Sequence, residues 1–103
     1  MKKLKCSEFE ERVLQSKKPV VVLFSNEWSG SAIIVEGALK EIEKEYQGRV
    51  YFFEMMQSEC TGISSSYGIA HVPAILVFKE GEVVEEIKGV PAKSTLRDKL
   101  SVI

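Results

Sequence analysis

The chain has 103 residues, with 14 lysines and arginines against 15 aspartates and glutamates, two cysteines and one histidine. A chain of this length buries one sizeable core, so we expect a single domain over residues 1–103. The near-neutral charge provides no basic field for a nucleic-acid backbone, and the apolar runs are too short to cross a bilayer. These features exclude nucleic acid and membrane as expected partners, and two widely spaced cysteines suit a reducing compartment. We therefore expect a cytoplasmic monomer.

The first part of the chain predicts a strand, a helix and a second strand. Residues 1–6 are an edge-strand candidate. Ser7 and Glu10 have the spacing of a capping box, in which the serine covers free amides and the glutamate reaches back, and they predict a helix over residues 7–16. The run from Pro19 to Phe24 is continuously apolar and β-branched, which is typical of a central strand buried on both faces.

The longest helix is predicted over residues 32–46. Apolar residues recur in it at helical spacing and predict its buried face, which comprises Ile34, Ala38, Ile42 and Tyr46. The glycine at position 48 ends this helix in the manner of a C-cap. A further buried strand is expected over residues 50–56, and a weak helix over residues 60–67.

The last part of the chain predicts an antiparallel hairpin of residues 74–79 and 83–88, followed by a helix over residues 93–101. The element order indicates an α/β protein with one mixed sheet that is covered on both faces. Ligands of such sheets meet the carboxyl ends of the strands. We therefore expect the site at the loops after Phe24 and before Ala74.

Several short segments follow one another along the chain in the order and at the spacing of a known protein family. They are Pro19–Phe24, Glu27–Gly30, Glu45–Gly48, Tyr67–Ile69, Val72–Pro73, Phe78–Glu82 and Gly89. Together they resemble the thioredoxin family almost from end to end. The resemblance implies the thioredoxin fold, a central mixed five-stranded sheet flanked by four helices.

The resemblance fails at the redox motif. In the family a Trp-Cys-Gly-Pro-Cys motif opens the long helix, whereas this chain has Ser29 and Ala32 at the two cysteine positions. Neither side chain supplies the thiolate that disulfide exchange needs. By spacing, Leu23 and Glu54 also replace a buried Asp and a Lys that manage protons in the family. We therefore interpret the chain as a natural redox-silent member, with no catalytic residue, cofactor or metal, and lean against an enzyme.

The peptide-docking half of the family's site is retained. Val72-Pro73 resembles the cis-proline loop, which offers backbone groups to an extended peptide. The prediction is a groove that holds an extended segment of a partner protein, and its expected residues are Trp28, Ser29, Gly30, Ser31, Val72 and Pro73. The alternative is that Trp28 and Pro73 only serve the fold, as a cover for the core and a tight turn.

A second class of function is a thiol–disulfide oxidoreductase or glutathione-linked protein of cell redox homeostasis that acts through Cys60 or Ser29. Cys60 begins a predicted helix, which would acidify an exposed thiol. Ser29 stands where some related folds hold the glutathione sulfur, although a helix N-cap is its simpler role.

The two cysteines themselves are expected to be reduced thiols. In the thioredoxin arrangement, however, Cys6 and Cys60 follow adjacent parallel strands, which leaves a disulfide open. His71 beside Ser29 would suggest hydrolysis, but this pair lacks an orienting carboxylate.

Overall fold

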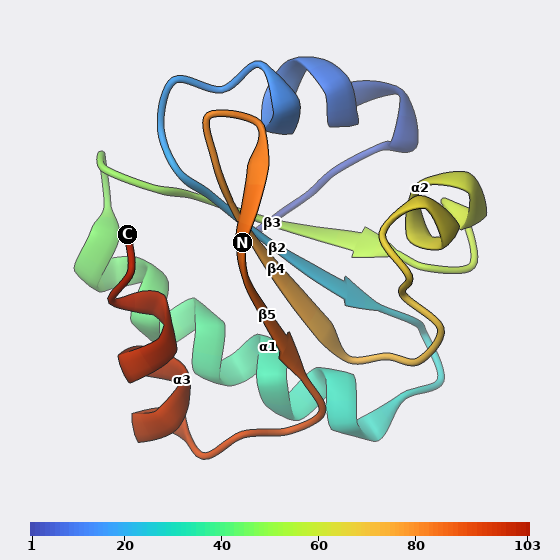
Figure 1. The fold of residues 1–103 in the computed structure, drawn as a ribbon. Coiled ribbons are helices and arrows are strands. Elements are labelled where there is room, and N and C mark those ends of the chain that lie inside the picture. Colours follow the sequence, from blue (N-terminus) through green and yellow to red (C-terminus); the bar gives the residue numbers. More distant parts are fainter.

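The computed structural model describes residues 1–103 and contains one mixed sheet of five strands (Figure 1). The strands are β1 (Lys2–Lys3), β2 (Val20–Ser25), β3 (Tyr51–Met56), β4 (Ala74–Lys79) and β5 (Glu82–Lys88), in the spatial order β1-β3-β2-β4-β5. β3 runs parallel to both β1 and β2, whereas β4 is antiparallel to both β2 and β5. The fold predicted from the sequence is therefore confirmed.

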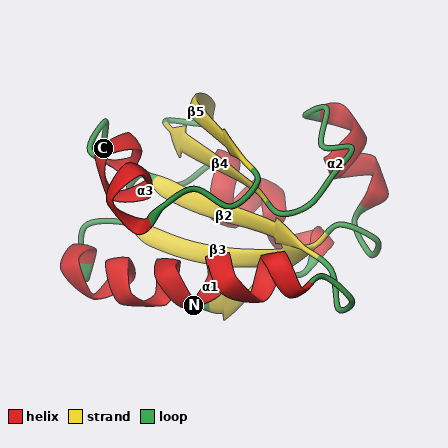
Figure 2. Cartoon of the chain, turned by 90° about the horizontal axis from the view of Figure 1, so that it is seen from below, coloured by secondary structure: helices red, strands yellow, loops and turns green.

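Helical segments cover both faces of the sheet. One face carries α1 (Gly30–Glu43), its continuation η3 (Lys44–Tyr46) and α3 (Lys93–Leu100), and the other carries the 3₁₀ turn η1 (Cys6–Glu8), the π-helical segment η2 (Glu10–Leu14) and α2 (Thr61–Ser66). Figure 2 shows α1 running along one face of the sheet, and in Figure 1 α1 and α3 lie together, away from α2. None of these helices is both long enough and apolar enough to pass through a bilayer.

The central strand β2 supplies both halves of the core. Val20, Val22 and Phe24 point into the apolar cluster beneath η2 and α2, whereas Val21 and Leu23 point into the cluster beneath α1 and α3. All six residues of β2 are buried. Because helices cover both faces of the sheet, this strand has no solvent-facing side, which explains its continuously apolar sequence.

The helix predicted over residues 7–16 is instead the pair η1 and η2, and its first turn is capped differently. The backbone N–H of Lys5 donates a hydrogen bond to Oε1 of Glu8 at 3.0 Å. The helical turn begins at Cys6, one residue earlier than predicted, which places Glu8 three residues after the capping position. The capping box predicted for Ser7 and Glu10 is therefore wrong.

The predicted buried face of α1 is wrong at Ile34, whereas Ile42 is buried and Ala38 and Tyr46 pack against the core as predicted. Ile34 is 63% exposed, and the buried residues of the helix are Ala32, Val35, Leu39 and Ile42. The helical period was predicted correctly, but apolar residues on two neighbouring stripes allow two settings. Contact with the sheet selects the stripe that contains Leu39.

Two alanine substitutions on α1 test this setting. Leu39→Ala removes a side chain that is 0% exposed, and it should lower the free energy of unfolding by about 3 kcal/mol through lost burial and a residual cavity. Ile34→Ala is the matched control and should cost less than about 0.5 kcal/mol. Urea unfolding followed by circular dichroism measures both values, and equal losses would contradict the assigned face.

Candidate functional site

The two cysteines form a disulfide, with their Cα atoms 5.5 Å apart. Cys6 comes shortly after β1 and Cys60 shortly after β3. The parallel pairing of β1 with β3 brings these two chain positions to the same end of the sheet. The expectation of two reduced thiols is therefore wrong. The sequence did not predict the bond, because residues that are 54 positions apart in the chain show no pairing signal by spacing alone.

The two bonded cysteines differ in their exposure to solvent. Cys60 is 5% exposed, and its backbone is held by hydrogen bonds from its N–H to the Met56 carbonyl at 3.1 Å and from Ser64 Oγ to its own carbonyl at 2.9 Å. Cys6 is half-buried, and its Sγ lies 3.0 Å from the carbonyl oxygen of Glu59. Cys6 is therefore the more exposed of the two residues.

The turn before α1 has a structural cap where the family carries its first redox cysteine. Oγ of Ser29 accepts a hydrogen bond from the backbone N–H of Ala32 at 3.0 Å, so its predicted role as an N-cap is confirmed. Oδ1 of Asn26 accepts a hydrogen bond from the N–H of Trp28 at 3.0 Å and tightens the turn. Trp28 is 90% exposed, whereas Ala32 is buried.

The loop before β4 has a cis peptide bond between Val72 and Pro73. Pro73 is buried, and its carbonyl oxygen accepts a hydrogen bond from the N–H of Gly89 at 3.1 Å. A cavity of about 130 Å³ lies beside this loop. His71 lines the cavity and forms no hydrogen bond with Ser29, and the turn formed by Trp28, Ser29, Gly30 and Ser31 contributes no residue to the lining.

A buried carboxyl group lies on β3, next to the start of α1. Glu54 is 6% exposed, and its Oε2 accepts a hydrogen bond from Ser25 Oγ at 2.9 Å. Burial raises the pKa of Glu54, and a hydrogen bond with Glu36 raises it further. The same hydrogen bond lowers the pKa of Glu36. Of the two carboxyl groups, Glu54 is therefore the one that takes up a proton first as the pH falls.

The surroundings of Glu54 explain why its pKa is raised. Lys3 on β1 and Leu23 on β2 are its aligned neighbours in the sheet, and Glu36 faces it from α1 across a cavity of about 240 Å³ that also contacts Ala32. Sequence reasoning identified Glu54 only as a replacement for a lysine. It missed Glu36, because that contact depends on the rotational setting of α1. No group of three or more metal-ligating side chains accompanies the pair.

Comparison with known proteins assigns the family. The chain matches the family profile described as thioredoxin over residues 1–102. It is 38% identical to the thioredoxin of Rickettsia felis over 92 residues, which cover 89% of this chain and 88% of that protein. It is 34% identical to a thioredoxin of a Synechocystis species over 94 residues, which cover 91% of this chain and 88% of that protein. The chain therefore belongs to the thioredoxin family.

A plant relative is longer than this chain. The chloroplastic M-type thioredoxin of Spinacia oleracea is 37% identical over 94 residues, which cover 91% of this chain but 52% of that protein. The chain thus spans about half the length of the spinach protein.

The interpretation of the chain as redox-silent is wrong. It rested on the missing sulfur atoms at Ser29 and Ala32, but the fold pairs Cys6 with Cys60 in a disulfide. The relatives are named thioredoxins. The findings therefore point to a redox-active protein whose sulfur chemistry is located away from the usual turn.

Reduction of the disulfide should destabilise the protein. The bond joins residues 54 positions apart, and closing a loop of that length in the unfolded chain is worth about 4 kcal/mol. Dithiothreitol should therefore lower the free energy of unfolding in urea by about 4 kcal/mol. The Cys6→Ser/Cys60→Ser variant is the control and should not respond to dithiothreitol. Identical wild-type curves with and without the reductant would contradict the assigned bond.

Stability should also depend on pH through Glu54. Because its pKa is raised in the folded state, Glu54 stabilises the fold fully at pH values below its ordinary pKa of about 4.5. This stabilisation is lost as the pH rises through the raised pKa. Glu36, whose pKa is lowered, has the opposite sign. Glu54→Gln keeps the group neutral, so the decline of Tm with rising pH should become shallower. Glu82→Gln, at an exposed site, should keep the wild-type slope, and the same slope in Glu54→Gln would contradict the assignment.

Proposed function

We propose that this protein carries out thiol–disulfide exchange with other proteins through Cys6 and Cys60, and that it serves cell redox homeostasis in the cytoplasm. The disulfide between these two cysteines is the observation that carries the proposal. The relatives named thioredoxins support it. In a reducing compartment, a disulfide is usually one that forms and breaks during catalysis or redox sensing.

The exchange begins at Cys6, because Cys60 is buried. A thiolate of a partner dithiol attacks Sγ of Cys6, and the bond to Cys60 breaks. The electron pair stays on the Cys60 sulfur, which takes up a proton, while Cys6 and the partner form a mixed disulfide. The partner's second thiolate then attacks the partner's first sulfur atom, which is bonded to Cys6 in the mixed disulfide. This attack releases Cys6 as a thiolate. The partner leaves oxidised and this protein leaves as a dithiol.

The reverse sequence reduces a partner's disulfide, with Cys6 attacking and Cys60 resolving. Its rate depends on the fraction of Cys6 that is thiolate. The Glu59 carbonyl oxygen lies 3.0 Å from Cys6 Sγ, so in the reduced protein it would accept a hydrogen bond from the thiol and repel the thiolate. The proposed exchange is therefore slower than that of a dithiol whose attacking sulfur faces amide donors.

Insulin reduction driven by dithiothreitol tests the proposal. The wild-type protein should accelerate the reaction above the uncatalysed rate, whereas Cys6→Ser/Cys60→Ser should leave it at that rate. This double variant is the matched control, because it retains the turn at Ser29 and Ala32. Equal rates for wild type and the double variant would overturn the proposed function.

The single variants test the order of attack. In Cys60→Ser the half-buried Cys6 is free, and in Cys6→Ser only the buried Cys60 remains. With Ellman's reagent the folded Cys60→Ser variant should react at least about tenfold faster than Cys6→Ser, and the difference should disappear in urea. Faster reaction of Cys60 in the folded protein would reverse the assigned roles.

A further inference from the structure

Cys6 lies in a turn that hydrogen bonds close at both ends. The N–H of Lys5 donates to Oε1 of Glu8 at 3.0 Å, and the N–H of Glu8 donates to the carbonyl oxygen of Lys5 at 2.9 Å. Cys6 and Ser7 are the two residues enclosed between these partners. A glutamate that reaches back from the third position to the capping backbone is typical of a capping box. The backbone around Cys6 is therefore fixed by contacts that do not involve its sulfur atom.

The residues on either side of this turn anchor it to the core. Leu4 and Phe9 are each 5% exposed and belong to the same apolar cluster as Cys60. They occupy the position before the cap and the fourth position of the turn, where apolar residues fix the direction in which the chain enters a helix. The N–H of Leu4 also donates to the carbonyl oxygen of Glu54 at 2.8 Å and extends the pairing of β1 with β3. The turn therefore holds Cys6 at a fixed place relative to β3.

Cys60 is held separately, on the other chain segment. Its N–H donates to the Met56 carbonyl oxygen at 3.1 Å, and its own carbonyl oxygen accepts hydrogen bonds from the N–H and the Oγ of Ser64, both at 2.9 Å. None of these contacts needs the bond between the two sulfur atoms, so they remain available after reduction. Cys60 is thus fixed by the core and its own turn, whereas the turn around Cys6 depends on one side chain, that of Glu8.

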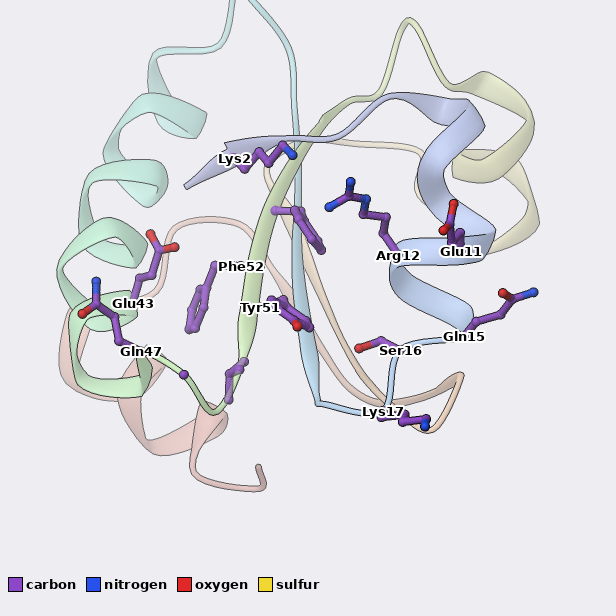
Figure 3. A pocket seen from close by; sticks show the side chains of 13 residues that line it. Lys2, Glu11, Arg12, Gln15, Ser16, Lys17, Glu43, Gln47, Tyr51 and Phe52 are labelled. Atoms are coloured by element: carbon purple, nitrogen blue, oxygen red, sulfur yellow. The ribbon is translucent and has the colours of Figure 1, made fainter.

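The carboxylate of Glu8 has one other charged partner. Its Oε2 lies 3.8 Å from Nε of Arg12, which projects from η2 and lines a groove of about 720 Å³ beside β3 (Figure 3). An ion pair of this length at the surface stabilises little. The hydrogen bond from the Lys5 N–H lowers the pKa of Glu8, so at neutral pH the group is an ionised acceptor. The contact with Lys5 is therefore the one that fixes this side chain.

We propose that Glu8 is a positioning residue for the disulfide, which keeps Cys6 within bonding distance of Cys60 after reduction so that the bond can form again. This inference rests on the proposed exchange through the two cysteines. Only reduced molecules in which the turn is formed can close the bond, so the apparent equilibrium constant for disulfide formation is scaled by the fraction of molecules in that conformation. Without the carboxylate of Glu8 the turn opens in part, and that fraction falls.

Equilibration with reduced and oxidised glutathione tests this role. Two glutathione thiols reduce the protein disulfide and become glutathione disulfide, and trapping the protein thiols with a maleimide at equilibrium gives the constant. Glu8→Ala should lower the constant for disulfide formation at least about threefold, in line with the loss of a helix cap. Glu8→Gln, whose amide oxygen still accepts the hydrogen bond, should stay within about twofold of the wild type. Glu10→Ala makes the same change of charge as Glu8→Ala at an exposed position two residues further on, and it should match the wild type.

These variants separate positioning from the other effects of the residue. A purely structural role would destabilise the oxidised and reduced forms alike and leave the constant of Glu8→Ala unchanged, which would overturn the proposal. An equal fall in Glu8→Gln would also overturn it, because the effect would then belong to the charge. In urea, where the turn is unfolded, Glu8→Ala and the wild type should give the same constant, and a persisting difference would count against the turn. The measurement uses no partner protein, so its failure is distinct from a failure to reduce insulin.

Discussion

The parallel pairing of β3 with β1 on one side and β2 on the other is the contact on which the rest of the site depends. It brings Cys6 within disulfide distance of Cys60. It also buries Glu54 between two strands and beneath α1, where it hydrogen-bonds to Ser25. The register of one strand thus connects two features that lie far apart in the sequence.

The location of the disulfide agrees with a general property of open α/β sheets, in which chemistry gathers at the carboxyl ends of parallel strands. β1, β2 and β3 run in the same direction, and Cys6, the turn at Ser29 and Cys60 all follow their carboxyl ends. In this chain the turn after β2 has a cap and no sulfur, whereas the segments after β1 and β3 carry the two bonded sulfur atoms. The sequence predicted the site at the loops after β2 and before β4, whereas the disulfide joins the segments after β1 and β3.

The carboxyl pair illustrates how the core accommodates a polar group. A charged glutamate at a site that is 6% exposed is costly, and this burial raises the pKa of Glu54, whose Oε2 accepts a hydrogen bond from Ser25 Oγ. Glu36 lies toward solvent on α1, and its pKa is lowered. The pair therefore makes the contact between α1 and β3 sensitive to pH, at a position where the sequence alone showed only an isolated acidic residue inside an apolar strand.

The sequence by itself determined the order of the elements, the buried strands and the helical period of α1. These features depend on local preferences, such as the apolar run of β2 and the serine that caps α1. Only the tertiary structure decided which stripe of α1 faces the sheet, that Cys6 bonds to Cys60, and that Glu36 meets Glu54. The physical reason is that each of these contacts joins different elements, so it depends on strand register and helix rotation, which are fixed by packing between layers and not by local pattern.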